Sequence, residues 1–385
     1  MQSAPLAGIT VYDFSQVVAG PYGGVLLAEY GADVVSVEPP QGSAQRRVLK
    51  QSTFPGVNHN KRSIAIDLKA EEADAVVEEI AKDADVILHN YTPGTMERLG
   101  CGYEQLREYN EELVYCSLTG FGEDGPYNDR RGYDPIAQAL SGLMSVTGEP
   151  DRKPSRVGSS LIDYGTGAHL AFAALGGIIQ RDRTGEGQKI ETSLFDVAAT
   201  FMGYWYTYYS RTGDVPERRS SSLDLNASQG IFTTADDLVF VEFADDRHWQ
   251  NLTRAIGRED WRDDERIATE QARNENREYL HDLVDAELKQ HGSEELLEAL
   301  LEANVPAARV NTIPQAIEDP QLEHRGTVRE ITDVDGKEVV VAGTPVHFSS
   351  YDPEIESPPG LGEHSQYHSS ATVHTACLSM LNPSS

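Results

Sequence analysis

The sequence lacks the features that would place it on nucleic acid, at an anionic surface or in a bilayer. Its 32 basic residues, only eight of them Lys, face 62 acidic residues, and the formal net charge is −30. So large a negative charge repels phosphates and argues against nucleic acid or an anionic membrane as a partner. No apolar run is long enough to cross a bilayer, and the N-terminus has no basic segment followed by an apolar core. We therefore predict a soluble, cytoplasmic protein.

Metal and nucleotide signatures are also missing. The three cysteines, Cys101, Cys116 and Cys377, form neither a CxxC pair nor a zinc-ligand spacing. The histidines near the C-terminus have no acidic or Cys partner at ligand spacing, so we expect a mobile tail there and no metal. Neither GxGxxG nor GxxxxGK[ST] occurs, and a nicotinamide or nucleoside-triphosphate site has no motif support. We expect no metal and no redox cofactor.

The acidic residues are spread along the chain rather than gathered in a tail, and 39% of the residues are hydrophobic. That composition is typical of a folded protein rather than a disordered one. A folded, acidic, Lys-poor chain resembles the cytoplasmic proteins of salt-accumulating halophiles, in which hydrated carboxylates maintain solubility and salt screens their repulsion. At 385 residues the chain is long enough for two domains with sizeable cores.

Strand-like and helix-like stretches alternate over the first 120 residues. Strands are predicted at residues 9–14, 34–38, 63–68, 86–91 and 113–118, with helices at 22–30, 70–84 and 103–110. This alternation predicts an α/β fold with a parallel sheet, whose ligand binds beyond the carboxyl ends of the strands. A hairpin near residues 231–243 and acidic helices over 248–303 follow a polar linker, and strands return after residue 323, the last of them at 346–349.

One ionisable residue stands before a strongly apolar helix. Residues 168–179 are apolar around the whole helical circumference, which predicts a buried helix, and Asp163 precedes them with Gly165 and Gly167 close by. In one interpretation Asp163 caps the free N–H groups of the helix. In the other it is a nucleophile, held by backbone N–H groups at an opening that glycines keep free for a ligand. The local sequence alone leaves both interpretations open.

Local charge is inverted between residues 45 and 69. The six cations of this stretch stand against a single acid, Asp67; they are Arg46, Arg47, Lys50, Lys61, Arg62 and Lys69. They could form a counter-patch that relieves self-repulsion or meets an acidic partner subunit. They could equally bind phosphate, since Arg and Lys supply charge-assisted donors to phosphate oxygens.

Seven ordered segments together resemble the family III CoA-transferases, the group of formyl-CoA and carnitine CoA-transferases. They are residues 11–40, 60–69 (NKRSIAIDLK), 90–100 (NYTPGTMERLG), 117–127 (SLTGFGEDGPY), the Asp163 stretch with 183–196, 304–310 (NVPAARV) and 361–365 (LGEHS). The resemblance implies an interlocked homodimer. It also implies a Rossmann-like large domain from both chain ends (1–210 and 323–372), a smaller inserted α+β domain (222–322) and a mobile tail (373–385).

The resemblance assigns roles position by position. Asp163 falls on the family's catalytic aspartate, and no metal is implied. The implied CoA-binding positions are Val17, Val18, Ala19, Ile66, Lys69, Asn90, Tyr91, Thr95, Arg98 and Arg131, of which the last is Lys in some relatives. Gln16, Tyr133 and Gly165 are expected to line the active site. The family context favours a CoA phosphate site for the cationic stretch over a counter-patch.

Two departures from the family pattern narrow the expected activity. The glycine-run loop of formyl-CoA transferases is replaced by ERRSSSLDL (217–225), and Tyr133 stands where acyl-CoA racemases have a His base. The resemblance to haloarchaeal members suggests CoA transfer from succinyl-CoA to a small dicarboxylate such as mesaconate, through an aspartyl anhydride and an aspartyl-CoA thioester. CoA thioesters would be substrates rather than cofactors. The alternatives are an acyl-CoA racemase and a non-catalytic CoA-binding protein.

Overall fold

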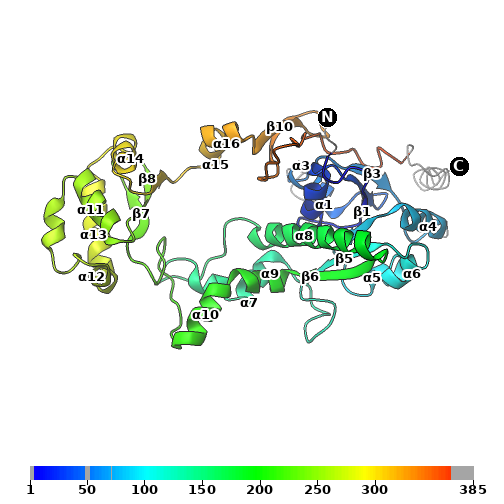
Figure 1. Ribbon diagram of the computed structural model, residues 1–385, viewed down its shortest axis with the longest axis horizontal. Coiled ribbons are helices and arrows are strands. Elements are labelled where there is room, and N and C mark those ends of the chain that lie inside the picture. The colour runs from blue at the N-terminus through cyan, green and yellow to red at the C-terminus, as the bar shows by residue number, and fades with distance from the viewer. Residues whose placement is uncertain (1–3, 48–52, 71, 366–385) are drawn as a thin grey trace. The chain divides into compact units, whose positions relative to one another are not determined.

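A computed structural model describes residues 4–47, 53–70 and 72–365, and its largest element is a six-stranded parallel sheet (Figure 1). The strands are β1 (Thr10–Asp13), β2 (Asp33–Glu38), β3 (Arg62–Ala65), β4 (Val86–His89), β5 (Val114–Thr119) and β6 (Gln188–Ser193). Their order in the sheet is β3-β2-β1-β4-β5-β6, so the chain moves outward from β1 in one direction and then from β4 in the other. Loops that follow β1 and β4 therefore diverge at one point, where doubly wound sheets bind ligands.

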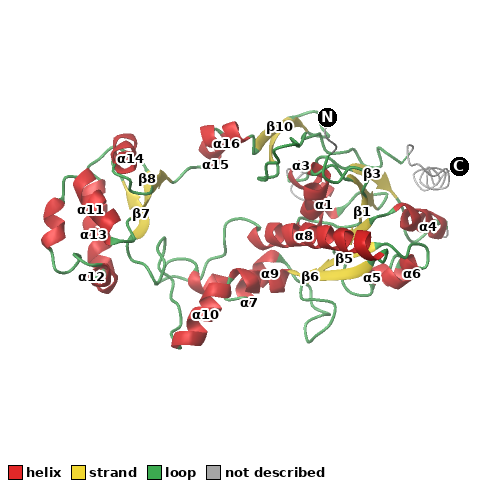
Figure 2. Ribbon diagram, viewed as in Figure 1, coloured by secondary structure: helices red, strands yellow, loops and turns green. Residues whose placement is uncertain are grey.

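Helices cover both faces of this sheet, because the buried strands are apolar on both sides (Figure 2). One face carries α1 (Ala19–Glu29) and α8 (Leu161–Thr184), which pack against each other. On the other face α4 (Ala73–Asp83) and α6 (Tyr103–Arg107) share one apolar core with alternate strand residues, among them Tyr12, Ile87 and Tyr115. The predicted α/β class with a parallel sheet is thus confirmed.

Several predicted elements differ from the structure. Strand β6 is an edge strand with alternating polar residues, and no strand was predicted there because it contains no apolar run. Residues 346–349 were expected to form a strand and do not. Helix α8 begins at Leu161, so Asp163 lies in its first turn rather than ahead of it.

The prediction that α8 is buried all round is wrong for the single chain. Leu170, Ala174 and Ile178 are buried against the sheet and α1, whereas Phe172 and Ile179 on the opposite side are 76% and 52% exposed. The apolar circumference of this helix therefore has one packed face and one open face.

The parallel sheet and its helices form one compact unit, and the remaining elements of this unit come from both ends of the chain. They are α2 (Ala44–Arg47), α3 (Pro55–Asn58), α5 (Thr95–Arg98), α7 (Asp134–Leu140), α9 (Leu194–Phe201), α16 (Pro320–Arg325) and the antiparallel pair β10 (Val328–Thr332) and β11 (Glu338–Ala342). The last described residues lie along the edge strand β3: the backbone N–H of Ala65 donates to Ser365 Oγ at 3.2 Å, and that of Gly362 donates to Ser63 Oγ at 3.0 Å. Residues 373–385, predicted as a mobile tail, lie outside the described residues.

A second unit comprises residues 142–157 and 202–319. Its elements are η2 (Leu143–Val146), α10 (Gly203–Thr212), β7 (Gln229–Thr233), β8 (Leu238–Glu242), α11 (Asp246–Ala255), η3 (Glu259–Asp263), α12 (Glu270–Glu275), α13 (Arg277–Leu288), α14 (Ser293–Glu302), β9 (Ala307–Arg309) and α15 (Ile313–Ile317). An antiparallel sheet β7-β8-β9 and the helices enclose their own core around Trp249 and Phe243. Residues 142–157 and helix α10 belong here, although the sequence-based boundaries placed them in the larger domain.

Among the described helices, none combines the length and the apolarity that a membrane crossing requires.

Candidate active site

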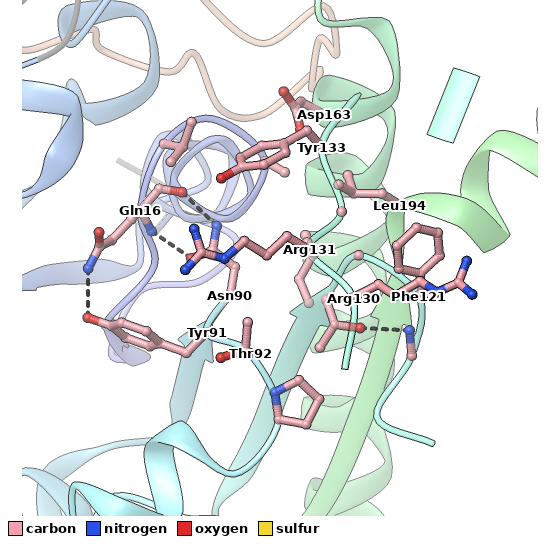
Figure 3. A pocket seen from close by; sticks show the side chains of 18 of the residues that line it. Gln16, Asn90, Tyr91, Thr92, Phe121, Arg130, Arg131, Tyr133, Asp163 and Leu194 are labelled. Atoms are coloured by element: carbon pink, nitrogen blue, oxygen red, sulfur yellow. Dashed lines mark hydrogen bonds between the residues drawn. The ribbon is translucent and has the colours of Figure 1, made fainter. Parts of the chain in front are cut away.

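A cavity of about 440 Å³ opens at the carboxyl ends of β1, β4 and β5 (Figure 3). Nine residues singled out from the sequence line it: Gln16, Val17, Val18, Ala19, Asn90, Tyr91, Arg131, Tyr133 and Asp163. Five others are not among its lining residues: Ile66, Lys69, Thr95, Arg98 and Gly165. The structure therefore gathers the expected nucleophile and the β1 and β4 loops around one space, whereas the expected phosphate contacts lie elsewhere.

The loop after β1 is tied to the loop after β4 by one side-chain amide. Asn90 Oδ1 accepts the backbone N–H of Gln16 at 2.8 Å, and Asn90 Nδ2 donates to the carbonyl of Gln16 at 2.6 Å. The side-chain amide of Gln16 donates in turn to the Tyr91 hydroxyl at 2.8 Å (Figure 3). The next residue, Val17, has φ of 70°, a left-handed conformation that costs a β-branched residue free energy. The Asn90 clamp supports this strained turn at the cavity wall.

A buried ion pair supports the same loop from beneath. Lys61 Nζ donates to Asp13 Oδ2 at 2.8 Å and to the carbonyl of Pro21 at 2.8 Å, while Asp13 Oδ1 accepts the backbone N–H of Ser15 at 2.9 Å. Burial lowers the pKa of the fully buried Lys61, and the neighbouring Asp13 opposes this shift. One lysine thereby joins the end of β1 to the first turn of α1.

This contact corrects the interpretation of the cationic stretch between residues 45 and 69. Lys61 is used inside the protein, Arg46 pairs with Glu38 at 2.7 Å, and Arg62 pairs with Asp33 at 2.9 Å. Lys50 lies outside the described residues, and Arg47 and Lys69 are exposed. Three of the six cations are thus paired with carboxylates of β1 and β2, two of them in buried pairs and Arg62 in a partly exposed one. A shared phosphate site formed by all six is excluded.

A third wall of the cavity comes from the segment between β5 and α7. This segment folds back on itself at Gly120 and Gly132, where a Cβ on Gly120 would lie 2.5 Å from the Gly132 Cα. That close approach places Arg131 and Tyr133 at the cavity, and Figure 3 shows the Arg131 side chain extended towards Gln16 and Asn90. The neighbouring Arg130 also lines the cavity and stacks on the Tyr127 ring at 3.8 Å from its centroid.

Asp163 stands at the cavity in the first turn of α8, but it does not cap this helix. The cap is supplied by Asp134, whose Oδ2 accepts the backbone N–H of Ile162 at 2.7 Å and that of Asp163 at 3.2 Å. The Asp163 carboxyl therefore faces the cavity. Burial and the charge of Asp134 raise the pKa of Asp163 to about 7, against the opposing effect of a hydrogen bond with Ser160.

The glycines beside Asp163 serve helix packing rather than ligand access. A Cβ on Gly167 would lie 2.3 Å from the carbonyl oxygen of Ala19 in α1, and one on Gly165 would lie 2.5 Å from the Phe201 ring. Both positions require glycine because neighbouring atoms occupy the space of a side chain. The expected glycine-lined opening is not the role of these two residues.

Backbone donors at the start of α1 lie at the cavity wall. Among the described side chains, none caps the N-terminus of this helix, and Val18 and Ala19 lie at the cavity wall. Uncapped N–H groups at a helix start bind anions, including oxyanions that form during acyl transfer. The donors expected around Asp163 itself are occupied by Asp134.

Sequence reasoning missed Asp134, and within the family-like segment 117–127 it did not single out Thr119 or Phe121, which line the cavity. A local signal for Asp134 was present, since Asp followed by Pro135 is a common helix start. Its contact with α8 could not be inferred, because Asp134 lies 28 residues before Ile162, the residue whose backbone N–H donates to it.

Comparisons with known proteins agree on one family. Residues 6–365 match CoA-transferase family III. The succinate–glutarate CoA-transferase of Agrobacterium fabrum is 35% identical over 374 residues, covering 94% of this chain and 94% of that protein. The succinyl-CoA:mesaconate CoA-transferase of Haloarcula hispanica is 35% identical over 362 residues, covering 89% and 90%.

A solved structure is similar over the same extent. A CAIB/BAIF family protein from Brucella suis matches with a TM-score of 0.86 and 34% identity, over 94% of this chain and 98% of that one. Sequence and fold therefore agree along nearly the whole described chain, and this protein belongs to CoA-transferase family III and is a CoA-transferase.

Proposed function

We propose that the enzyme moves CoA from succinyl-CoA to a small dicarboxylate such as mesaconate, with Asp163 as the covalent nucleophile. The observation that carries the proposal is the position of this residue: among the described residues that line the cavity, Asp163 is the only carboxylate. Relatives named for succinyl-CoA or succinate together with glutarate, citramalate or mesaconate support a dicarboxylate substrate class. The cavity arginines Arg130 and Arg131 complement the charge of such acids.

The proposed reaction needs one nucleophile and two acyl transfers. A carboxylate oxygen of Asp163 attacks the thioester carbonyl carbon, the C–S bond breaks, and the CoA thiolate leaves with the electron pair. The thiolate then attacks the γ-carbonyl carbon of Asp163, succinate departs, and an aspartyl-CoA thioester remains. The accepting carboxylate repeats these two steps in reverse. No net proton or electron is gained, because one carboxylate replaces another.

The cavity walls supply the other requirements of this chemistry. The uncapped N–H groups of α1 are the proposed donors to the tetrahedral oxyanion. The Asn90-clamped loop and Arg131 are proposed to hold the CoA moiety near its thioester. Lys69 and Arg98, outside this cavity, are proposed to contact the more distant phosphates of the long CoA molecule, together with Ile66 and Thr95.

We also propose that the enzyme works as the interlocked homodimer that the family resemblance implies. Apolar side chains of α7, α8 and α9 support this, because they are exposed although the three helices contact one another. They include Ile136, Leu140, Phe172, Ile179 and Phe201. Exposed apolar area of this kind on neighbouring elements marks an interaction surface.

Trapping tests the covalent role directly. Wild-type enzyme incubated with succinyl-CoA and hydroxylamine should yield a hydroxamate on the Asp163 peptide, visible as a mass shift. Asp163→Ala should show neither adduct nor transfer, while Asp163→Asn retains the shape without the nucleophile. Transfer that survives in Asp163→Ala would refute the proposal. Loss of the substrate's α-proton in deuterated water without CoA transfer would instead identify a racemase.

A further inference from the structure

Two carboxylates meet at the start of α8, and only one of them faces the substrate cavity. We infer that Asp134 is a positioning residue whose fixed negative charge favours the acylated form of Asp163 over its free carboxylate. This inference rests on the proposed covalent role of Asp163. It adds a second acid to the reaction that neither lines the cavity nor touches the substrate.

Asp134 is held rigidly in the buried interior. Its side chain is 3% exposed, and it accepts three hydrogen bonds: from the backbone N–H groups of Ile162 and Asp163 and from Gln138 Nε2 at 2.7 Å. Two of the three donors are amides at the N-terminus of a long helix, where the helix dipole favours an anion. These contacts hold the Asp134 carboxylate in place while chemistry proceeds beside it.

The groups that surround Asp163 leave Asp134 as the nearby fixed charge. From α1, Tyr22 packs edge-on against Tyr164 of α8 with ring centroids 4.6 Å apart, and burial raises the pKa of both phenols, so they stay neutral. The segment before α7 brings Arg130, Arg131 and Tyr133 to the same cavity, and neither arginine is among the causes of the shift in the pKa of Asp163.

Two further ionisable groups lie on the neighbouring turns. On α8, exposed His169 bonds the carbonyl of Gly165 at 2.8 Å. On α9, Asp196 accepts a hydrogen bond from Ser193 at 2.7 Å. Neither is among the causes that set the pKa of Asp163, whereas burial and Asp134 both raise it to about 7.

The reaction changes the charge of Asp163 and leaves that of Asp134 unchanged. Free Asp163 is an anion beside an anion, a repelled state. In the anhydride and in the aspartyl-CoA thioester its γ-carbonyl is neutral, because the charge has left on the thiolate and then on the released acid. Asp134 therefore raises the energy of the free enzyme relative to both covalent forms, and the same amides that it occupies are unable to stabilise the free Asp163 carboxylate.

The test compares variants that separate charge from hydrogen bonding. Asp134→Asn retains an oxygen acceptor for the α8 amides but removes the charge, whereas Asp134→Glu retains the charge. Asp245→Asn is the matched control, since Asp245 caps α11 in the other unit through the His248 amide at 2.7 Å. Each variant is mixed with fixed concentrations of succinyl-CoA and succinate, quenched, and weighed intact to give the ratio of thioester to free enzyme.

We expect the thioester ratio of Asp134→Asn at pH 8 to fall on the order of tenfold, the effect that one pKa unit represents. The acid limb of kcat/KM, which reports the free enzyme, should move to lower pH because Asp163 then ionises more readily. Asp134→Glu should remain closer to wild type, and Asp245→Asn should change neither quantity. A thermal midpoint for each variant separates a lost cap from a lost charge.

An Asp134→Asn enzyme that folds and shows the wild-type ratio and acid limb would overturn the inference. If Asp134→Asn does not fold, the inference is judged on Asp134→Glu. A thioester ratio in that variant about tenfold below the wild-type ratio would then overturn it. Failure of the proposed function looks different: wild-type enzyme would then form no adduct on Asp163 at all.

Discussion

Replacing Asp163, the proposed nucleophile, should make the fold more stable. The pKa of Asp163 is raised from 3.8 to about 7 in the folded state, chiefly by burial and next by Asp134. The folded protein therefore binds a proton at this carboxyl more tightly than the unfolded chain does. For such a group the penalty is absent below the unfolded pKa, grows as the pH rises, and is complete above the folded pKa. About three pKa units correspond to at most about 4 kcal/mol above pH 7.

Part of this penalty is screened, because Asp163 is only half-buried. We therefore expect Asp163→Asn to gain about 2 kcal/mol in the free energy of unfolding at pH 8.5. By the same linkage the gain should be smaller by about 1 kcal/mol at pH 5.5, where the folded wild-type enzyme keeps Asp163 protonated. Urea titrations at both pH values, at constant molar KCl, measure the two differences.

A control with the opposite sign is available in the other unit. The backbone amide of His248 holds the pKa of Asp245 below its ordinary value, so this carboxylate stabilises the fold at neutral pH and loses that effect in acid. Asp245→Asn should therefore be destabilising to the same extent at pH 8.5 and at pH 5.5, and less so only below the ordinary pKa of 3.8. If Asp163→Asn instead destabilises the enzyme, or stabilises it equally at both pH values, the raised pKa of Asp163 is refuted.

Three further outcomes are expected. Activity and folding should require high KCl, because the excess of 30 acids repels itself when unscreened; full, stable activity in dilute buffer contradicts this. Arg131→Gln should raise KM for acyl-CoA more than it lowers kcat, and an unchanged KM would remove Arg131 from CoA binding. Phe172→Glu on the open face of α8 should shift sedimentation towards monomer and reduce transfer, and an active monomer would exclude the proposed interlocked dimer.

The sequence was informative where local pattern decides the structure. Apolar runs located five of the six parallel strands to within a few residues, because buried strands need continuous apolar sequence. Strand β6 escaped because an edge strand alternates polar residues. The family resemblance predicted that Asp163, Asn90 and Arg131 belong to one site, and all three line one cavity. Composition and periodicity alone could not predict this.

Contacts between distant residues were beyond the sequence. Lys61 is a residue type that often binds phosphate, yet its side chain is buried and donates to Asp13, which lies 48 residues away in the sequence. Gly167 has the signature of a ligand opening, yet the atom that excludes a side chain there belongs to Ala19. In both cases the residue type was compatible with two roles, and only the packing of α1 on the sheet and on α8 decided between them.

The same long-range contacts explain how the cavity is kept ready for reaction. Asn90 satisfies the backbone of the β1 loop, Lys61 anchors the end of β1 to α1, and Asp134 satisfies the first amides of α8. These three side chains are thus bonded to other parts of the scaffold, which fixes the walls of the cavity before substrate arrives. Asp163 differs from them: its carboxyl has a hydrogen bond with Ser160 but lies in a half-buried site beside a like charge. If Asp163 is the nucleophile that we propose, forming its neutral acyl bond relieves this repulsion, and the packing of α7 against α8 then favours the proposed covalent intermediate.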